Sequence, residues 1–155
     1  MEENLMFLNV SDKVYDESSI RELSPLALAF LGDGVFELLV RTELLNKNKN
    51  PKTLHREAIK SVKASAQATK INRVIDILTE EELGVFRRGR NAKSHTMPKN
   101  ATVRDYKEAT GLEALFGYLY LLNKGSRILE LYSLMEEDSE SWNYSKYSKS
   151  RWGNS

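Results

Sequence analysis

Two acidic residues stand alone in two strongly apolar stretches of this chain. Asp33 lies between two glycines in LALAFLGDGVFELL (26–39), and Glu113 lies near the start of GLEALFGYLYLLN (111–123). A carboxylate buried without a partner is costly, so it must pair with a cation, take up a proton or bind a metal ion. No lysine or arginine occurs within either stretch. A cationic partner would therefore have to come from elsewhere in the chain.

These isolated acids have two interpretations. In the structural one they form ion pairs or cap neighbouring backbone, since such pairs also leave single acids in apolar surroundings. In the functional one they hold Mg²⁺, which prefers oxygen ligands, keeps several waters and takes further ligands from substrate phosphates. A metal ion held in this way activates a water molecule and neutralises the charge that develops on phosphorus. The second interpretation predicts hydrolysis of a phosphodiester.

The residues around Asp33 predict a buried helix with a close contact to another group. Residues 25–45 carry apolar side chains on every face of a helical wheel, which is typical of a helix inside a bundle. We therefore expect Asp33 and its neighbour Glu37 to be partly desolvated. Each glycine in a helix interior costs ~1 kcal/mol relative to alanine. Gly32 and Gly34 thus indicate a close contact on this helix.

The elements that must position these acids are all predicted to be helices. Ser24 and Pro25 are typical of a helix start, and Thr79 with Glu82 forms a capping-box pattern. No segment shows the sustained alternation of a strand. We predict an all-α protein with helices over 25–46, 53–78, from Thr79 through LGVFRRGR, about 103–123 ended by Gly125, and 126–137.

Length and composition bound the type of protein. The chain has 155 residues, 41% hydrophobic and 29% charged, and no cysteine, which excludes disulfides and thiolate metal sites. Met1 is followed by two glutamates rather than a signal peptide, and no apolar run approaches the roughly 18 residues of a membrane span. We expect a cytoplasmic protein without membrane contact. The predicted domain covers residues 1–138, and the Ser- and aromatic-rich tail 139–155 is predicted to be poorly ordered.

A net charge of +1 conceals a strong asymmetry along the chain. Residues 1–25 hold six acids and two bases, whereas residues 86–107 hold seven bases and one acid. A basic stripe is also predicted on helix 53–78, formed by Arg56, Lys60, Lys63, Gln67 and Lys70. Such a stripe is often only a solvated face, but together with RRGRNAK (87–93) it favours binding of a polyanion. Cations without interleaved aromatics suit the phosphates of a duplex better than base stacking.

Two motifs resemble those of the ribonuclease III catalytic-domain family. LALAFLGDGVFE (26–37) is similar to the signature helix of that family, and EALFGYLYL (113–121) is similar to its second metal-binding helix. The family has further acids where this chain carries Ala29 and Thr110. With those departures, the short length and the phrase RRGRNAKS, the chain most resembles the Mini-ribonuclease III branch, which lacks a double-stranded-RNA-binding domain.

The resemblance implies a dimeric helical bundle that cleaves double-stranded RNA. Asp33 and Glu113 would be the catalytic and metal-binding acids for Mg²⁺, with Mn²⁺ as a substitute, and Glu37 a possible outer-shell contact. Hydrolysis would leave 5′-phosphates. In that branch the substrate is precursor large-subunit (23S) ribosomal RNA, to which a ribosomal protein could contribute. The alternative is a non-catalytic helical module that binds double-stranded RNA.

The same resemblance assigns residues to the two surfaces that such an enzyme needs. Phe30 and Val35 are expected at the homodimer interface, because the signature helix contributes to it in the family. A two-fold dimer would place one site on each strand of a duplex. Without a separate binding domain, the basic surface must hold the RNA, and the predicted contacts are Lys60, Lys63, Arg87, Arg88, Arg90 and Lys93.

Overall fold

The computed structural model describes residues 14–45, 49–93, 97 and 99–136, and within these ranges the regular elements are helices, without a strand. The all-α prediction is confirmed. The tail 139–155 lies outside the described residues, so its boundary stays a prediction. The elements are α1 (Glu17–Arg21), α2 (Pro25–Leu45), α3 (Pro51–Val62), α4 (Ala64–Val74), the 3₁₀ turn η1 (Ile75–Ile77), α5 (Glu80–Asn91), α6 (Val103–Leu121) and α7 (Gly125–Met135).

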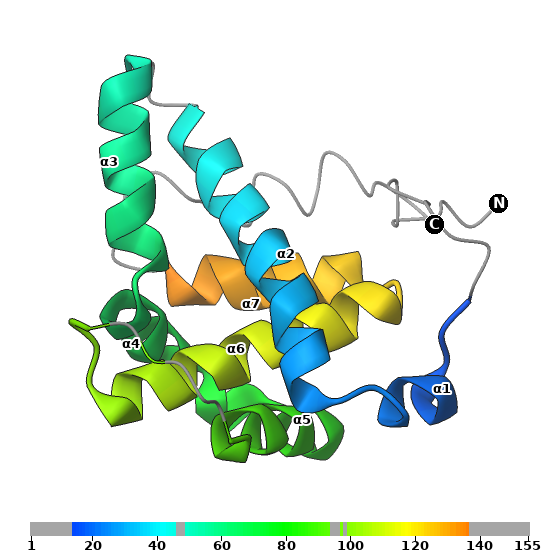
Figure 1. The fold of residues 1–155 in the computed structure, drawn as a ribbon. Helices are drawn as coiled ribbons and strands as arrows, with labels where there is room; N and C mark the ends of the chain where they lie inside the picture. Colours follow the sequence, from blue (N-terminus) through cyan, green and yellow to red (C-terminus); the bar gives the residue numbers. More distant parts are fainter. Residues whose placement is uncertain (1–13, 46–48, 94–96, 98, 137–155) are drawn as a thin grey trace, which may run out of the picture.

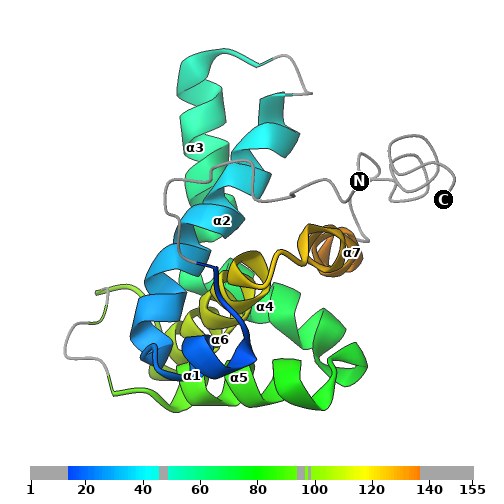
Figure 2. The same ribbon diagram turned by 90° about the vertical axis from the view of Figure 1, so that its right-hand side faces the viewer.

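Helix α6 is the centre of the fold, and α2, α4, α5 and α7 pack around it (Figure 1). From Ala109 to Leu119 every residue of α6 is buried except Glu113, which is half-buried. Helices α2 and α3 lie side by side and rise together above the other helices (Figure 2). No helix in the described part of the chain is long and apolar enough to cross a membrane.

The crossing of α2 and α6 depends on two glycines. A Cβ placed on Gly32 would lie 1.6 Å from the backbone oxygen of Glu113, and one placed on Gly117 would lie 2.1 Å from the backbone oxygen of Leu28. The close approach predicted at Gly32 is therefore made by the backbone of α6. At Gly34 the same prediction is wrong within the described residues, because a Cβ there would meet no atom within 4 Å.

The single helix predicted over 53–78 is wrong. Lys63 is extended, with φ −63° and ψ 153°, so that α3 ends at Val62 and α4 begins at Ala64. The break lets α3 pack against α2 while α4 packs against α6 and α7, which one straight helix could not do. Both segments show the amphipathic pattern of a helix, and this pattern does not indicate that the two segments pack against different partners.

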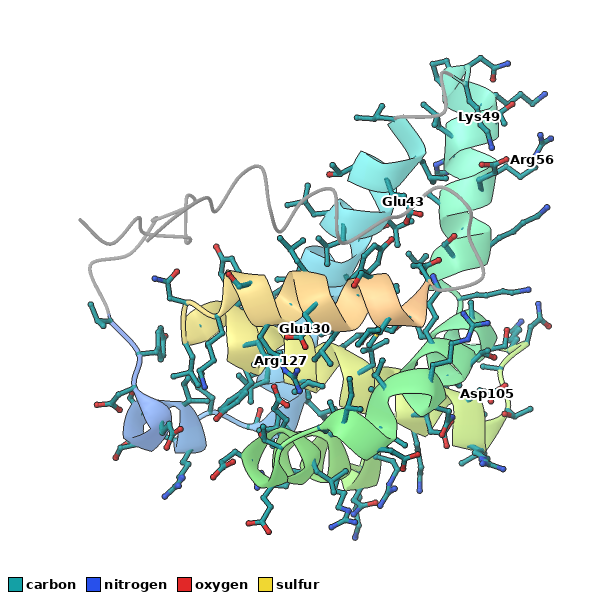
Figure 3. The ribbon with its side chains drawn as sticks, turned by 180° about the vertical axis from the view of Figure 1, so that it is seen from behind. Glu43, Lys49, Arg56, Asp105, Arg127 and Glu130 are labelled. Atoms are coloured by element: carbon teal, nitrogen blue, oxygen red, sulfur yellow. The ribbon has the colours of Figure 1, made fainter. Side chains whose placement is uncertain are left out.

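The break also disrupts the predicted basic stripe. Gln67 is 2% exposed, and Lys70 is buried with its ammonium group 2.7 Å from Glu136 and above the ring of Phe36. The stripe is therefore wrong at these two positions. Arg56, Lys60 and Lys63 are exposed as predicted, and Figure 3 shows Arg56 pointing away from the body of the protein.

Helix ends follow the predicted local signals with one exception. Ser24 accepts a hydrogen bond from the backbone N–H of Ala27, and Thr79 and Glu82 form the predicted capping box. The prediction that Gly125 ends the preceding helix is wrong, since Gly125 is the first residue of α7. The left-handed residue that ends α6 is Asn123, with φ 60°, a conformation that asparagine tolerates.

Helix α2 is not buried on every side, contrary to the prediction from its wheel. Leu26, Phe30 and Leu38 are 39%, 86% and 48% exposed. The core needs only the opposite side of α2, where Leu28, Phe36 and Val40 pack. The exposed side thus carries large apolar residues that the described core leaves uncovered.

Candidate active site

Asp33 and Glu113 share one cleft, as predicted. The cleft has a volume of about 670 Å³ and is lined by residues of α2, α4, α6 and the segment before α6, together with the turn between α3 and α4. The glycine crossing explains this convergence, because Gly32 touches the backbone of Glu113 and Asp33 is the next residue. Asp33 is exposed at the cleft and Glu113 is half-buried.

The two carboxylates disfavour each other's charge. Burial, together with the negative charge of Asp33, raises the pKa of Glu113 to about 7, although a hydrogen bond from Gln67 opposes the shift. The pKa of Asp33 is also raised, first by partial burial and then by the nearby charge of Glu37. Neither carboxylate has a lysine, arginine or histidine as an ion-pair partner among the described residues. A proton on Glu113 or a cation near the pair would relieve this repulsion.

Two other buried acids show what a structural carboxylate looks like in this fold. Glu82 accepts hydrogen bonds of 2.9 and 2.8 Å from the guanidinium of Arg127 (labelled in Figure 3). Burial would raise the pKa of Glu82, but the bonds from Arg127 hold it below its ordinary value. Glu43, from α2, accepts a hydrogen bond from the hydroxyl of Tyr132. The structural interpretation holds for these acids and does not describe Asp33 and Glu113.

Gln67 is the hydrogen-bond partner of Glu113. Its side-chain Nε2 donates to Oε1 of Glu113 over 3.2 Å and to the backbone oxygen of Val62 over 2.7 Å. Its Oε1 is buried and accepts no hydrogen bond from the residues that the structure describes, which costs about 1–3 kcal/mol while the atom stays unsatisfied. The helix break at Lys63 creates this arrangement, because it frees the Val62 oxygen and turns Gln67 toward α6.

These groups fit a divalent metal ion of the Mg²⁺ type. Asp33, Asp105, Glu113 and Gln67, which all carry side-chain oxygens, line the same cleft, and Mg²⁺ prefers oxygen donors and retains waters. Within the described residues no three His, Cys, Asp or Glu side chains come together as a metal site. The described residues would therefore supply a small part of the coordination shell of such an ion, and water and a substrate phosphate would supply the rest.

The two positions where further acids are missing also lie in the cleft. Ala29 is 5% exposed, and Thr110 is 8% exposed with its hydroxyl donating to the backbone oxygen of Tyr106. Glu37 is placed one turn after Asp33, forms an ion pair with Arg41 at 3.0 Å and does not line the cleft. Its outer-shell role stays a prediction, and its observed effect is on the pKa of Asp33.

The predicted basic contacts are spread over different surfaces. Lys63, at the break between α3 and α4, is the one that lines the cleft, and Lys60 is exposed on α3. Arg88 lines a separate groove of about 460 Å³ between α1, α2 and α5. Arg87 and Lys93 are exposed, whereas Arg90 is half-buried against the ring of Phe86. Their roles in RNA binding stay predictions.

The structure adds two groups of cleft residues that the sequence analysis did not select. Gln67 was assigned to the basic stripe, although it is the one uncharged member of that stripe, and this difference is the signal that could have singled it out. The segment before α6 also lines the cleft, together with the first turn of α6 that carries Asp105 (labelled in Figure 3). Its participating residues are Asn100, Ala101, Thr102 and Asp105.

The raised pKa of Glu113 predicts an unusual pH dependence of stability in the metal-free protein. The folded protein holds this proton up to a pH of about 7, whereas the unfolded chain releases it near 4.5. Between these values the unfolded chain binds fewer protons, so the free energy of unfolding falls as the pH rises, by up to about 3 kcal/mol.

Urea denaturation in EDTA at pH 5 and pH 8 measures this fall. We expect Glu113→Gln to remove most of it and to be more stable than the original chain at pH 8. Replacement of the exposed Glu22 by glutamine is the control and is expected to keep the original pH dependence. An equal pH dependence in Glu113→Gln and in the original chain would contradict the prediction.

Comparison with known proteins gives a consistent result. Residues 26–124 match the family model described as Ribonuclease III domain. A Mini-ribonuclease 3 of Clostridium tetani is 42% identical over 88% of this chain and 94% of its own length, and one of Thermoanaerobacter is 44% identical over 86% and 95%. A crystal structure of a protein from Fusobacterium nucleatum is 38% identical, covers 77% of this chain and 96% of its own, and has a TM-score of 0.71.

Proposed function

Since this chain belongs to the ribonuclease III domain family and is an endoribonuclease of that family, we propose that it hydrolyses double-stranded RNA with a divalent metal ion held by Asp33 and Glu113. The observation that carries this assignment is the shared cleft of the two carboxylates, which repel each other's charge and have no cationic partner among the described residues.

Each residue of the cleft has a role that follows from its position. Asp33 and Glu113 would hold Mg²⁺, for which Mn²⁺ can substitute, and orient the attacking water. The metal, when bound, lowers the pKa of that water and stabilises charge on phosphorus. Gln67 keeps Glu113 in place through its hydrogen bond. Lys63, exposed at the cleft, attracts the phosphate backbone. The products carry 5′-phosphates and 3′-hydroxyls.

The biological substrate that we propose is precursor 23S ribosomal RNA, whose ends the enzyme matures in the cytoplasm, with a ribosomal protein as a possible additional partner. The relatives that support this proposal are bacterial proteins named Mini-ribonuclease 3. Accumulation of extended 23S precursor in cells that lack the protein tests it. Normal 23S ends in such cells would contradict it.

We propose a homodimer in which the exposed side of α2 forms the interface. Phe30 is 86% exposed and Val35 half-buried, and burying such apolar area favours association. Two sites in one dimer would cut both strands of a duplex. Sedimentation equilibrium of the original chain and of Phe30→Asp measures the state, and a monomeric original chain would contradict the proposal.

RNA binding is expected to depend on the lysine at the cleft. Lys63→Ala is expected to remove one phosphate contact. The slope of the logarithm of the RNA-binding constant against the logarithm of the salt concentration then becomes less steep by about 1. Lys124→Ala removes an equal charge from an exposed position at the start of α7 and is expected to keep the original slope. Filter binding of a catalytically inactive variant at several salt concentrations measures both, and equal slopes for the two variants would remove Lys63 from the RNA interface.

The decisive experiment is cleavage of a long RNA duplex by the purified chain. We expect endonucleolytic products with 5′-phosphate ends in Mg²⁺ or Mn²⁺, none in EDTA, and no cleavage of the same sequence as single strands or as DNA duplex. Binding of the duplex without cleavage in either metal would favour the alternative, a non-catalytic RNA-binding module.

A further inference from the structure

The orientation of the Gln67 side-chain amide is determined by its neighbours. Its nitrogen lies 2.7 Å from the backbone oxygen of Val62 and 3.2 Å from Oε1 of Glu113, and both partners are acceptors. The reversed orientation would place the amide oxygen against these two oxygens. Both N–H groups are therefore in use, and the amide oxygen faces away from these acceptors.

The amide oxygen of Gln67 has no hydrogen-bond donor among the described residues. The side chain is 2% exposed, and its Oε1 is buried. Gln67 lines the cleft together with Asp33 and Glu113. A buried polar atom usually has a hydrogen-bond partner, and Gln67 borders a cleft of about 670 Å³, which is large enough to hold water.

We propose that Gln67 is a positioning residue of the metal site: its Nε2 holds Glu113, and its Oε1 accepts a hydrogen bond from a water of the metal's hydration shell. The inference rests on the proposed function. With Asp33 and Glu113 as its protein ligands, most of the shell of a Mg²⁺-type ion is water, and those waters need acceptors. Outer-shell partners that orient ligands in this way commonly change metal affinity by 10–100-fold.

Asn72 provides a matched control on the same helix. Its side-chain amide donates to the backbone oxygen of Ala68 over 2.7 Å and to Glu108 of α6 over 2.9 Å. As for Gln67, one bond goes to a nearby backbone oxygen and the other to a glutamate of α6. Asn72 and Glu108 do not line the cleft. A general effect of losing an amide bridge between α4 and α6 would appear in both variants.

Two replacements of Gln67 separate its two tasks. Gln67→Met has a similar length but offers neither the donor nor the oxygen acceptor. Gln67→Glu keeps an oxygen acceptor but loses both donors. If Gln67 only linked Val62 to Glu113, both variants would weaken metal binding alike. If its oxygen also serves the hydration shell, Gln67→Glu loses less metal affinity than Gln67→Met, because an acceptor remains.

The test is Mn²⁺ binding to the RNA-free protein, followed by electron paramagnetic resonance of free Mn²⁺, with circular dichroism and metal-free unfolding to verify the fold. We expect the Kd of Gln67→Met to rise about 10–100-fold and that of Gln67→Glu to rise by less than about tenfold, because it loses the bond to Glu113 but keeps an acceptor. The Kd of Asn72→Leu is expected to stay within about threefold of the original chain. Unchanged affinity in Gln67→Met, or equal losses in Gln67→Met and Gln67→Glu, would overturn the proposal. If Gln67→Met does not fold, Gln67→Glu decides alone, and a rise of its Kd by about tenfold or more would overturn the proposal.

Asp33→Asn distinguishes this result from failure of the proposed function. If Asp33→Asn loses Mn²⁺ binding while Gln67→Met binds fully, the role proposed for Gln67 is overturned and the proposed metal site still holds. An original chain that binds no Mn²⁺ would overturn both the metal site and the positioning role.

Discussion

Asp33→Asn and Glu113→Gln are each expected to lower the rate of RNA duplex cleavage by about a thousandfold or more, while the fold and RNA binding persist. The carboxylates line one cleft without cationic partners among the described residues, so their charge is available for a metal ion. Loss of a single preorganised electrostatic contact at a reaction centre already costs about 10²–10³-fold in rate. Loss of a ligand from a two-carboxylate site costs more, because the remaining acid must hold the ion alone.

Single-turnover cleavage of an end-labelled duplex measures these rates, and filter binding and circular dichroism verify RNA binding and fold. Glu108→Gln is the matched control, because Glu108 lies on the same helix but pairs with Arg104 and Asn72 outside the cleft. Its rate is expected to stay within about threefold, because Glu108 does not line the cleft. Metal-dependent turnover at the original rate in Asp33→Asn or Glu113→Gln would exclude the two-acid mechanism.

Gly32→Ala is expected to lower the free energy of unfolding by about 4 kcal/mol or more. A Cβ on Gly32 would lie 1.6 Å from the backbone oxygen of Glu113, and a backbone atom cannot move aside as a flexible side chain can. Helices α2 and α6 would have to separate at the centre of the core. The loss is a large part of the 5–15 kcal/mol by which domains are commonly stable.

Gly34→Ala is the matched control, two residues further along the same helix. A Cβ there meets no atom within 4 Å, so the higher helix propensity of alanine is expected to stabilise the protein by about 0.5–1 kcal/mol. Urea denaturation of both variants measures the contrast. Similar stability of Gly32→Ala and Gly34→Ala would mean that α2 and α6 do not cross at Gly32.

The same crossing connects stability to catalysis. Gly32 precedes Asp33, and the atom it approaches belongs to Glu113. Any substitution that pushes α2 from α6 therefore also moves the two acids apart. For this reason we expect Gly32→Ala protein that remains folded to lose cleavage activity, whereas Gly34→Ala keeps it.

The sequence by itself determined the helical class, most helix ends and the two acids of the site. These features depend on signals within a few residues: the capping box at Thr79 and Glu82 acts over one turn, and apolar periodicity reports that a segment is helical. An acid isolated in an apolar stretch can be identified from the sequence alone, because its apolar neighbours in the chain already indicate that burying its charge is costly. Asp33 and Glu113 were found in this way, and the structure places them in one cleft.

Tertiary structure alone decided which helix face meets which partner. The break at Lys63, the burial of Gln67 and the exposure of Phe30 all depend on where α6 and α2 lie. An apolar helix face has the same sequence pattern whether the core of its own chain covers it or leaves it to solvent or a second chain. The pattern around Gly32 and Gly34 is likewise symmetric, yet only Gly32 contacts α6. Packing partners are chosen by long-range fit, which no short stretch of sequence encodes.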